Sequence, residues 1–185
     1  HITDERISIH LALDDVCFPS TLISVTPTSN KENYIPNLNS DDLVITREML
    51  LELLDDISSL FLEGLIIRTR PNSTKKMSQD YMESTPPFFT IEAMQYIRDR
   101  GVKHLLVDVP SVDRLFDDGH LSCHNIFWDT KEKKYNSETM NYTITEMIYV
   151  DNKIDDGHYL LNLQIPSFVS DAAPSRPIIF KLNDL

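Results

Sequence analysis

Side chains that bind metals or move protons gather directly after one apolar segment of this 185-residue chain. Residues 105–107 are apolar, and the groups that follow them are Asp108, Ser111, Asp113, His120 and His124, with Glu146 further along the sequence. Imidazole and carboxylate groups together bind zinc, manganese or iron, and they also act as general acids and bases. The pattern therefore predicts a site with chemical function in a loop at the end of a buried strand.

A catalytic metal site is one interpretation of this cluster, with His124 and Glu146 as ligands. Such a site polarises a carbonyl group and activates water near neutral pH. A cysteine-rich structural zinc site is excluded, because Cys17 and Cys123 are the only cysteines. On spacing alone, simpler interpretations stand beside this one: a solvated loop histidine, and a strand glutamate that faces water. A serine nucleophile at Ser111 is disfavoured because no G-x-S-x-G motif is present.

Two helices and several short strands are expected to position these groups. Thr46 and Thr90 are suitable N-caps for helices over about 46–57 and 90–100, and Gly101 is placed to end the second helix. Strands are expected at 21–25, 44–45, 65–69, 105–109, 143–150, 159–165 and 177–182. This mixture predicts an α/β class. The proline-bearing segment 70–89 is typical of a binding loop or lid, and 129–141 of an exposed hairpin or loop.

Composition excludes several classes of partner. The net charge is −12, which disfavours nucleic acid and anionic membranes as partners. No apolar run reaches the roughly 18 residues of a membrane span. Only four glycines are present and no G-x-G-x-x-G motif, which argues against a nucleotide site. Two cysteines favour a reducing compartment, so we expect a cytoplasmic protein.

Several stretches, taken in order, resemble the metal-dependent cyclase family, which includes kynurenine formamidase and isatin hydrolase. Residues 106–113 resemble the family's "GIDTPSVD" segment, and 63–69 resemble its "GDxVLIRT" strand. The remaining matches are 88–93, 101–103, 121–127, 145–148 and 159–166. Each match is weak alone, and the ordered set covers nearly the whole chain.

The resemblance implies a fold, a reaction and a site. The fold is a compact mixed-sheet domain of the swivelling β/β/α type, assembled as a homodimer or homotetramer. The reaction is hydrolysis of an amide or a cyclic amide or ester by metal-activated water, as in an arylformamidase. The resemblance assigns His124 and Glu146 as ligands of a divalent metal, Zn or Mn. It also makes Ser111 and Asp113 residues that shape the adjoining loop.

The family's N-terminal motif, H-x-G-T-H-x-D-x-P-x-H, is where this sequence departs from the pattern. Only His1 has a counterpart in it, the last histidine, which transfers a proton beside the metal; alternatively, His1 is a remnant without a role. We therefore expect residues 1–185 to form one cyclase-like hydrolase domain that lacks the first part of the motif. A family member that keeps the fold and binds a ligand or partner without catalysis is the alternative function.

Phe88 and Phe89 are the candidate substrate-binding residues of this interpretation. They are adjacent in sequence, and they would wall an apolar pocket for the substrate. Packing in the protein core is the simpler interpretation of the same two side chains.

Overall fold

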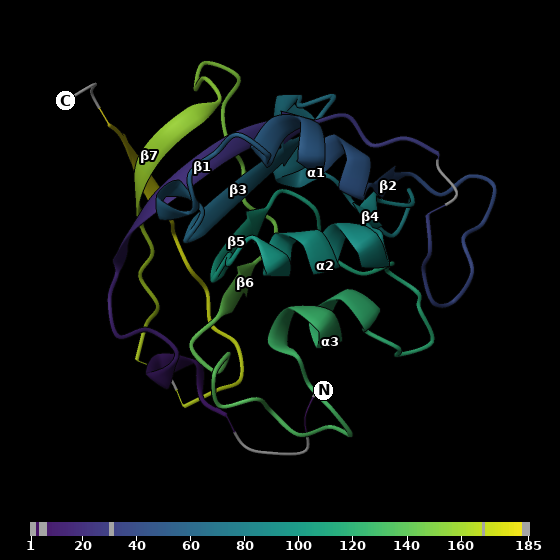
Figure 1. Cartoon of the computed structure of the whole chain (residues 1–185). Helices are drawn as coiled ribbons and strands as arrows, with labels where there is room; N and C mark the ends of the chain where they lie inside the picture. The colour runs from purple at the N-terminus through teal and green to yellow at the C-terminus, as the bar shows by residue number, and fades with distance from the viewer. Residues whose placement is uncertain (1–2, 4–6, 30–31, 168, 183–185) are drawn as a thin grey trace.

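Six strands form one mixed sheet in the order β6-β5-β3-β1-β7-β8 (Figure 1). The computed structural model describes residues 3, 7–29, 32–167 and 169–182. Four neighbouring strands are parallel, and β7 and β8 extend the sheet in antiparallel fashion. The strands are β1 Cys17–Val25, β3 Gly64–Thr69, β5 His104–Val107, β6 Thr143–Thr145, β7 Gly157–Asn162 and β8 Ile178–Lys181. The expected mixed α/β class is confirmed.

Three α-helices pack together on one face of the sheet (Figure 1). They are α1 Arg47–Leu54, α2 Ile91–Asp99 and α3 Ser122–Trp128. A two-stranded parallel sheet lies beside them, made of β2 Val44–Ile45 and β4 Phe88–Phe89. Single 3-10 turns span Ile9–Leu11, Ser59–Phe61 and Thr74–Ser78. Within the described ranges, no helix combines the length and apolar character needed to cross a membrane.

The first two helices begin where their side-chain caps predict. The Thr46 hydroxyl accepts a hydrogen bond from the Met49 amide at 3.3 Å, and Thr90 accepts one from the Ala93 amide at 3.1 Å. Each bond satisfies one of the amides that the first turn of a helix leaves without an internal partner. Gly101 follows α2 with a φ of +78°, a conformation that glycine adopts without steric cost.

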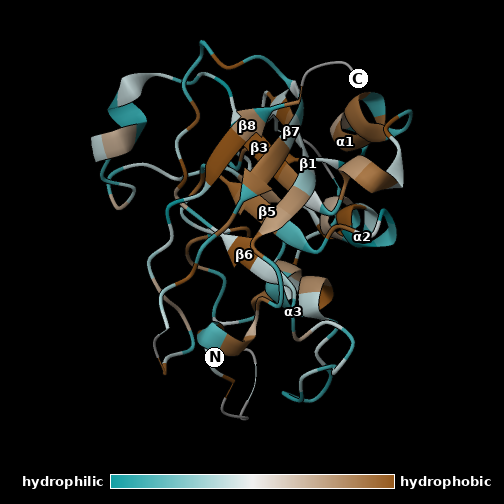
Figure 2. Cartoon of the chain, turned by 90° about the vertical axis from the view of Figure 1, so that its left-hand side faces the viewer, coloured by the Kyte–Doolittle hydropathy of each residue, from teal (hydrophilic) through white to brown (hydrophobic). Residues whose placement is uncertain are grey.

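The alternating strand residues build two separate cores. Leu65 and Ile67 of β3 face the helices and join the larger core, whereas Ile66 between them faces the opposite side. On that opposite side, Tyr159 and Leu161 of β7 complete a smaller core covered by loops. Figure 2 shows the apolar strands at the centre, with the three α-helices on one side and loops with short helical turns on the other. The parallel strands are apolar on both faces because both faces are covered.

Besides β1, which begins at Cys17 rather than at residue 21, and α1, which ends at Leu54 rather than near residue 57, two segments differ from the sequence-based expectation. The strand expected over 143–150 ends at Thr145, because Glu146 turns toward the loop after β5 and Met147 adopts a φ of +57°. The polar cluster expected in a loop includes a short helix, α3, which carries His124. In 129–141, Lys131 and Lys134 form an isolated antiparallel bridge, in keeping with the expected exposed excursion.

Arg68 is a charged residue enclosed within the fold. Its guanidinium group donates to the Asp156 carboxylate at 2.7 Å and to the backbone oxygens of Asp151 and Ile154 at 2.8 and 2.9 Å. It also donates to the Ser24 hydroxyl at 2.8 Å. These bonds attach the loop 151–156 to β1 and β3.

Replacement of Arg68 by methionine is expected to lower the free energy of unfolding by about 1–3 kcal/mol, because it leaves four partly buried acceptors without their donor. Urea unfolding followed by circular dichroism measures the change. Arg70→Met is the matched control, since Arg70 is two residues along and exposed. Equal stability of the two variants would contradict a structural role for the buried guanidinium.

His104 is a second buried polar residue, at the start of β5. Its ring lies 4.0 Å from the Phe18 ring, centroid to centroid, and its Nδ1 lies 3.0 Å from the Thr143 hydroxyl. Burial lowers the pKa of His104 from 6.5 to about 4. The folded protein therefore holds this imidazole neutral at pH values where the unfolded chain protonates it.

Stability is expected to fall as the pH is lowered from about 6.5 to about 4, by at most about 3 kcal/mol from this group. The unfolding free energy falls because, between these pH values, His104 binds a proton in the unfolded chain and not in the folded protein. Unfolding free energies of wild type and His104→Asn across the window isolate the contribution. The slope of unfolding free energy against pH should flatten in His104→Asn. It should persist in His120→Asn, which alters an exposed histidine. Parallel slopes for wild type and His104→Asn would contradict the assignment.

Candidate functional site

The polar residues converge where the parallel strands end. The carboxyl ends of β1, β3, β5 and β6 lie along one edge of the sheet, because these strands run in the same direction. Asp113 lies in the loop after β5, and Glu146 comes directly after β6. α3 follows the same loop and carries His124. Open α/β sheets commonly bind ligands at this edge.

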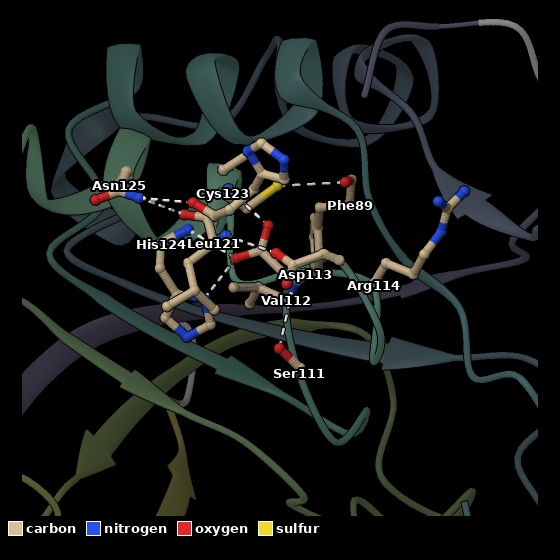
Figure 3. Close-up of polar contacts among 12 residues, drawn as sticks. Phe89, Ser111, Val112, Asp113, Arg114, Leu121, Cys123, His124 and Asn125 are labelled. Carbon is tan, nitrogen blue, oxygen red and sulfur yellow. Dashed lines mark hydrogen bonds and ion pairs between the residues drawn. The ribbon is translucent and has the colours of Figure 1, made fainter. Parts of the chain in front are cut away.

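Asp113 provides the N-terminal cap of α3 from outside the helix. The residue at the capping position is Leu121, which has a φ of +48° and makes no side-chain capping bond. Asp113 Oδ1 instead accepts from the Cys123 amide at 2.7 Å, and Oδ2 accepts from the His124 amide at 3.1 Å (Figure 3). A carboxylate at this position also interacts favourably with the positive end of the helix dipole.

The same carboxylate orients the imidazole of His124. Asp113 Oδ2 lies 2.6 Å from His124 Nδ1, and the Tyr34 hydroxyl donates to Oδ1 at 2.9 Å. Burial works to raise the pKa of Asp113, but the His124 contact and the two amide bonds outweigh it and lower the pKa. Asp113 is therefore an ionised carboxylate with its hydrogen-bonding capacity largely satisfied.

Glu146 faces the other nitrogen of the same imidazole ring. Its Oε1 lies 3.5 Å from His124 Nε2 and accepts a hydrogen bond from the Val112 amide at 3.0 Å. Burial raises the pKa of Glu146, and the charge of His124 opposes that rise. His124 thus lies between two carboxyl groups, one at each ring nitrogen.

This placement favours positive charge at His124. Burial works to lower the pKa of His124, but the hydrogen bond and charge of Asp113 outweigh it, with smaller contributions from Glu146 and Asp117, and raise the pKa. When Nδ1 carries a proton toward Asp113, a neutral ring presents an electron pair at Nε2 toward Glu146. Two acceptor atoms then face each other, an arrangement that either a proton or a metal cation between them relieves.

The donor atoms fit a divalent cation in spacing and chemistry. Bonds of about 2.0–2.2 Å at a tetrahedral centre place a nitrogen and an oxygen ligand roughly 3.4 Å apart, and Nε2 and Oε1 are 3.5 Å apart. A carboxylate behind the ligating histidine, in the position of Asp113, is a common feature of zinc sites. Within the described residues, no group of three or more His, Cys, Asp or Glu side chains is arranged to hold a metal ion.

The other candidate residues occupy different positions. The Ser111 hydroxyl accepts from the Asp113 amide at 3.1 Å and so fixes the turn before the carboxylate. Phe88 and Phe89 are fully buried in the helix-side core, so the structure places them behind the site rather than on a pocket wall. Both residues lie on β4, and the Phe89 amide donates to the Val112 backbone oxygen at 3.0 Å. This bond supports the loop that carries Asp113. His1 lies outside the described residues.

Two contributors were not anticipated from the sequence. Tyr34 bonds to Asp113 and accepts from the Arg114 amide at 2.9 Å, and burial raises the pKa of its hydroxyl, which keeps it a donor. Arg114 pairs with Asp42 and lies over the rings of Tyr34 and Phe88. Tyr34 stands 79 positions before Asp113 in sequence, so no local pattern relates the two.

A mixed α/β domain with a histidine and a carboxylate at the carboxyl edge of its sheet is typical of metal-dependent enzymes. The model of the family described as "Putative cyclase" matches residues 1–114. The chain belongs to this cyclase family, and the resemblance read from the sequence is confirmed. The matched residues include Ser111 and Asp113, whereas His124 and Glu146 lie beyond them.

A curated relative and three solved structures extend this comparison. Kynurenine formamidase of Bacillus cytotoxicus is 28% identical over 117 residues, which are 63% of this chain and 49% of that protein. The chain thus spans about half the length of the curated relative it matches.

The solved structures share the fold. A potential metal-dependent hydrolase with cyclase activity has a TM-score of 0.65 at 19% identity, over 100% of this chain and 75% of that one. A predicted metal-dependent hydrolase from Bacillus stearothermophilus has a TM-score of 0.56 at 20% identity, over 90% and 64%. An isatin hydrolase bound to thioisatinate has a TM-score of 0.53 at 13% identity, over 86% and 59%. These likenesses confirm the cyclase-like fold.

Proposed function

We propose that this protein is a metal-dependent hydrolase that cleaves an amide, or a cyclic amide or ester, of a small molecule. The observation that carries the proposal is the His124–Glu146 pair, with Nε2 and Oε1 at the separation of two ligands of one cation. The family membership and a relative named kynurenine formamidase support the same reaction class. A divalent cation, Zn or Mn, would supply Lewis-acid polarisation of the carbonyl and activation of water.

The residues of the chain have distinct roles in this proposal. His124 and Glu146 hold the cation, together with further ligands. Asp113 keeps His124 in the tautomer that presents the electron pair of Nε2, because its carboxylate accepts a hydrogen bond from Nδ1–H. The Val112 amide fixes Glu146 through Oε1. His1 is proposed as the proton-transferring residue, by its resemblance to the last histidine of the family motif.

The proposal includes the compartment, the oligomeric state and the partners of the protein. We expect it to act in the cytoplasm, as a homodimer or homotetramer, on a small-molecule substrate. With a net charge of −12, it is not expected to use nucleic acid or an anionic membrane as a partner.

A hydrolysis assay on the intact protein tests the reaction class. The protein is stripped with a chelator, reloaded with Zn²⁺ or Mn²⁺, and given formanilide, a cyclic amide and a lactone in separate assays that follow acid release. At least one substrate should be hydrolysed, and chelation should abolish that hydrolysis. Metal-loaded protein that stays at the background rate with all three would instead support the alternative, a family member that binds without catalysis.

A further inference from the structure

Tyr34 is a buried residue beside the candidate site, and its hydroxyl joins two groups of the loop after β5. The side chain is 4% exposed. The hydroxyl accepts a hydrogen bond from the Arg114 amide at 2.9 Å and donates one to Asp113 Oδ1 at 2.9 Å. Because an amide N–H can only donate, the phenolic proton is directed at the carboxylate. Tyr34 is therefore a hydrogen-bond donor of fixed direction.

The neighbours of the Tyr34 ring hold it in this position. The Phe88 ring lies 4.8 Å away, centroid to centroid, with 57° between the two planes. The guanidinium carbon of Arg114 lies 5.6 Å from the centroid of the Tyr34 ring, and the guanidinium group is itself paired with Asp42. A ring enclosed in a close-packed interior has little freedom to turn its hydroxyl away from Asp113.

The donors around Asp113 are divided between its two oxygens (Figure 3). Oδ1 accepts from Tyr34 and from the Cys123 amide, whereas Oδ2 accepts from the amide and the ring of His124. Rotation of the carboxylate about its Cβ–Cγ bond would break the bond from Tyr34. Among these donors, Tyr34 is the one that does not belong to α3, so its bond holds the carboxylate independently of that helix.

We infer that Tyr34 is a positioning residue of the candidate metal site, which acts through Asp113 on the ring of His124. The bond from Tyr34 keeps Oδ2 turned toward Nδ1. Nδ1 then carries the ring proton, and Nε2 presents its electron pair toward Glu146. The inference rests on the proposed function for the metal, whereas the orientation of the ring can be measured without one.

The zinc affinity of Tyr34→Phe is the first test. One hydrogen bond corresponds to a factor of about 2–10 in an equilibrium constant, so the variant should bind Zn²⁺ about fivefold more weakly than wild type. The substitution removes one oxygen atom and leaves the ring and both metal-ligating side chains in place. Competition of the intact protein with a chromophoric chelator for Zn²⁺ measures the affinity.

Tyr96→Phe is the matched control for the zinc measurement. Tyr96 is 8% exposed and lies 5.7 Å from the guanidinium carbon of Arg100, and its hydroxyl accepts a hydrogen bond from Arg100 at 2.8 Å. It therefore repeats the surroundings of Tyr34 without a bond to Asp113, and its loss should leave the zinc affinity as in wild type. Affinity that is unchanged in Tyr34→Phe, or lowered equally in Tyr96→Phe, would overturn the inference.

The tautomer of His124 is the second test, and it needs no metal. In metal-free protein at alkaline pH, nitrogen-15 NMR distinguishes an imidazole protonated at Nδ1 from one protonated at Nε2. The Nδ1–H form should predominate in wild type, and Tyr34→Phe should raise the share of the Nε2–H form about twofold or more. The signals of His104, which contacts Thr143, should stay the same in both proteins. Equal tautomer ratios for His124 in the two proteins would contradict the inference.

The failure of each idea gives a different result. Wild-type protein that takes up no Zn²⁺, or that hydrolyses none of the test substrates, sinks the proposed function, and the His124 tautomer then decides whether Tyr34 positions the ring. Zinc-dependent hydrolysis by wild type, with zinc affinity and tautomer ratio unaltered in Tyr34→Phe, sinks the inference and leaves the proposed function intact.

Discussion

Replacement of Asp113 by alanine is expected to lower the free energy of unfolding by about 3–5 kcal/mol. The carboxylate is almost fully buried, and four donors point at it: the Tyr34 hydroxyl, the amides of Cys123 and His124, and the His124 ring. Removing it leaves the first turn of α3 without a cap and leaves a partly buried imidazole without its anion. Thermal and urea unfolding, followed by circular dichroism, measure the loss.

Two further variants give this prediction its controls. Asp41→Ala removes an exposed carboxylate and should change the unfolding free energy by less than about 0.5 kcal/mol. Asp113→Asn keeps the shape and one acceptor oxygen but removes the charge, so its stability should lie between wild type and Asp113→Ala. If Asp113→Ala is as stable as Asp41→Ala, then α3 is not capped in the manner described.

Loss of the His124 side chain is expected to weaken divalent metal binding by about 100-fold or more. The physical reason is that Nε2 is one of the two donor atoms at ligand spacing. Among the described residues, His124 is the histidine that pairs with Glu146. The measurement is metal content after dialysis of the intact protein against buffered Zn²⁺ or Mn²⁺, by elemental analysis of wild type and His124→Ala.

His120→Ala is the matched control for the metal measurement. His120 lies four residues earlier and is exposed, so the metal content of this variant should equal that of wild type. Glu146→Gln should weaken binding as well, because an amide oxygen carries no full negative charge. Metal content that is unchanged in both His124→Ala and Glu146→Gln would refute the ligand assignment.

The parts of the fold that follow local rules were predictable from the sequence. Thr46 and Thr90 set the starts of α1 and α2, and Gly101 sets the end of α2, through contacts within four residues, so their signals are visible in a single stretch. The apolar segment that becomes β5 was likewise visible, and so was the placement of polar residues directly after it. The structure brings Asp113, His124 and Glu146 together as side-chain neighbours.

The parts that depend on distant contacts were not predictable. α3 has Leu121 at its capping position and begins because Asp113, a residue of the preceding loop, caps it. Tyr34 joins the site only through the tertiary fold. Phe88 and Phe89 illustrate the reverse case, since adjacent aromatic residues fit a pocket wall and a core strand equally well in sequence, and only burial separates the two.

The shared use of Asp113 links local unfolding to ligand affinity. Any ligand that favours the observed position of the His124 ring must also favour the closed first turn of α3, and by thermodynamic reciprocity the closed turn favours the ligand by the same factor. The amide protons of Cys123 and His124, which bond to this carboxylate, can exchange with solvent only when that turn opens. Hydrogen exchange at these two amides is therefore a direct measure of how often the candidate site comes apart.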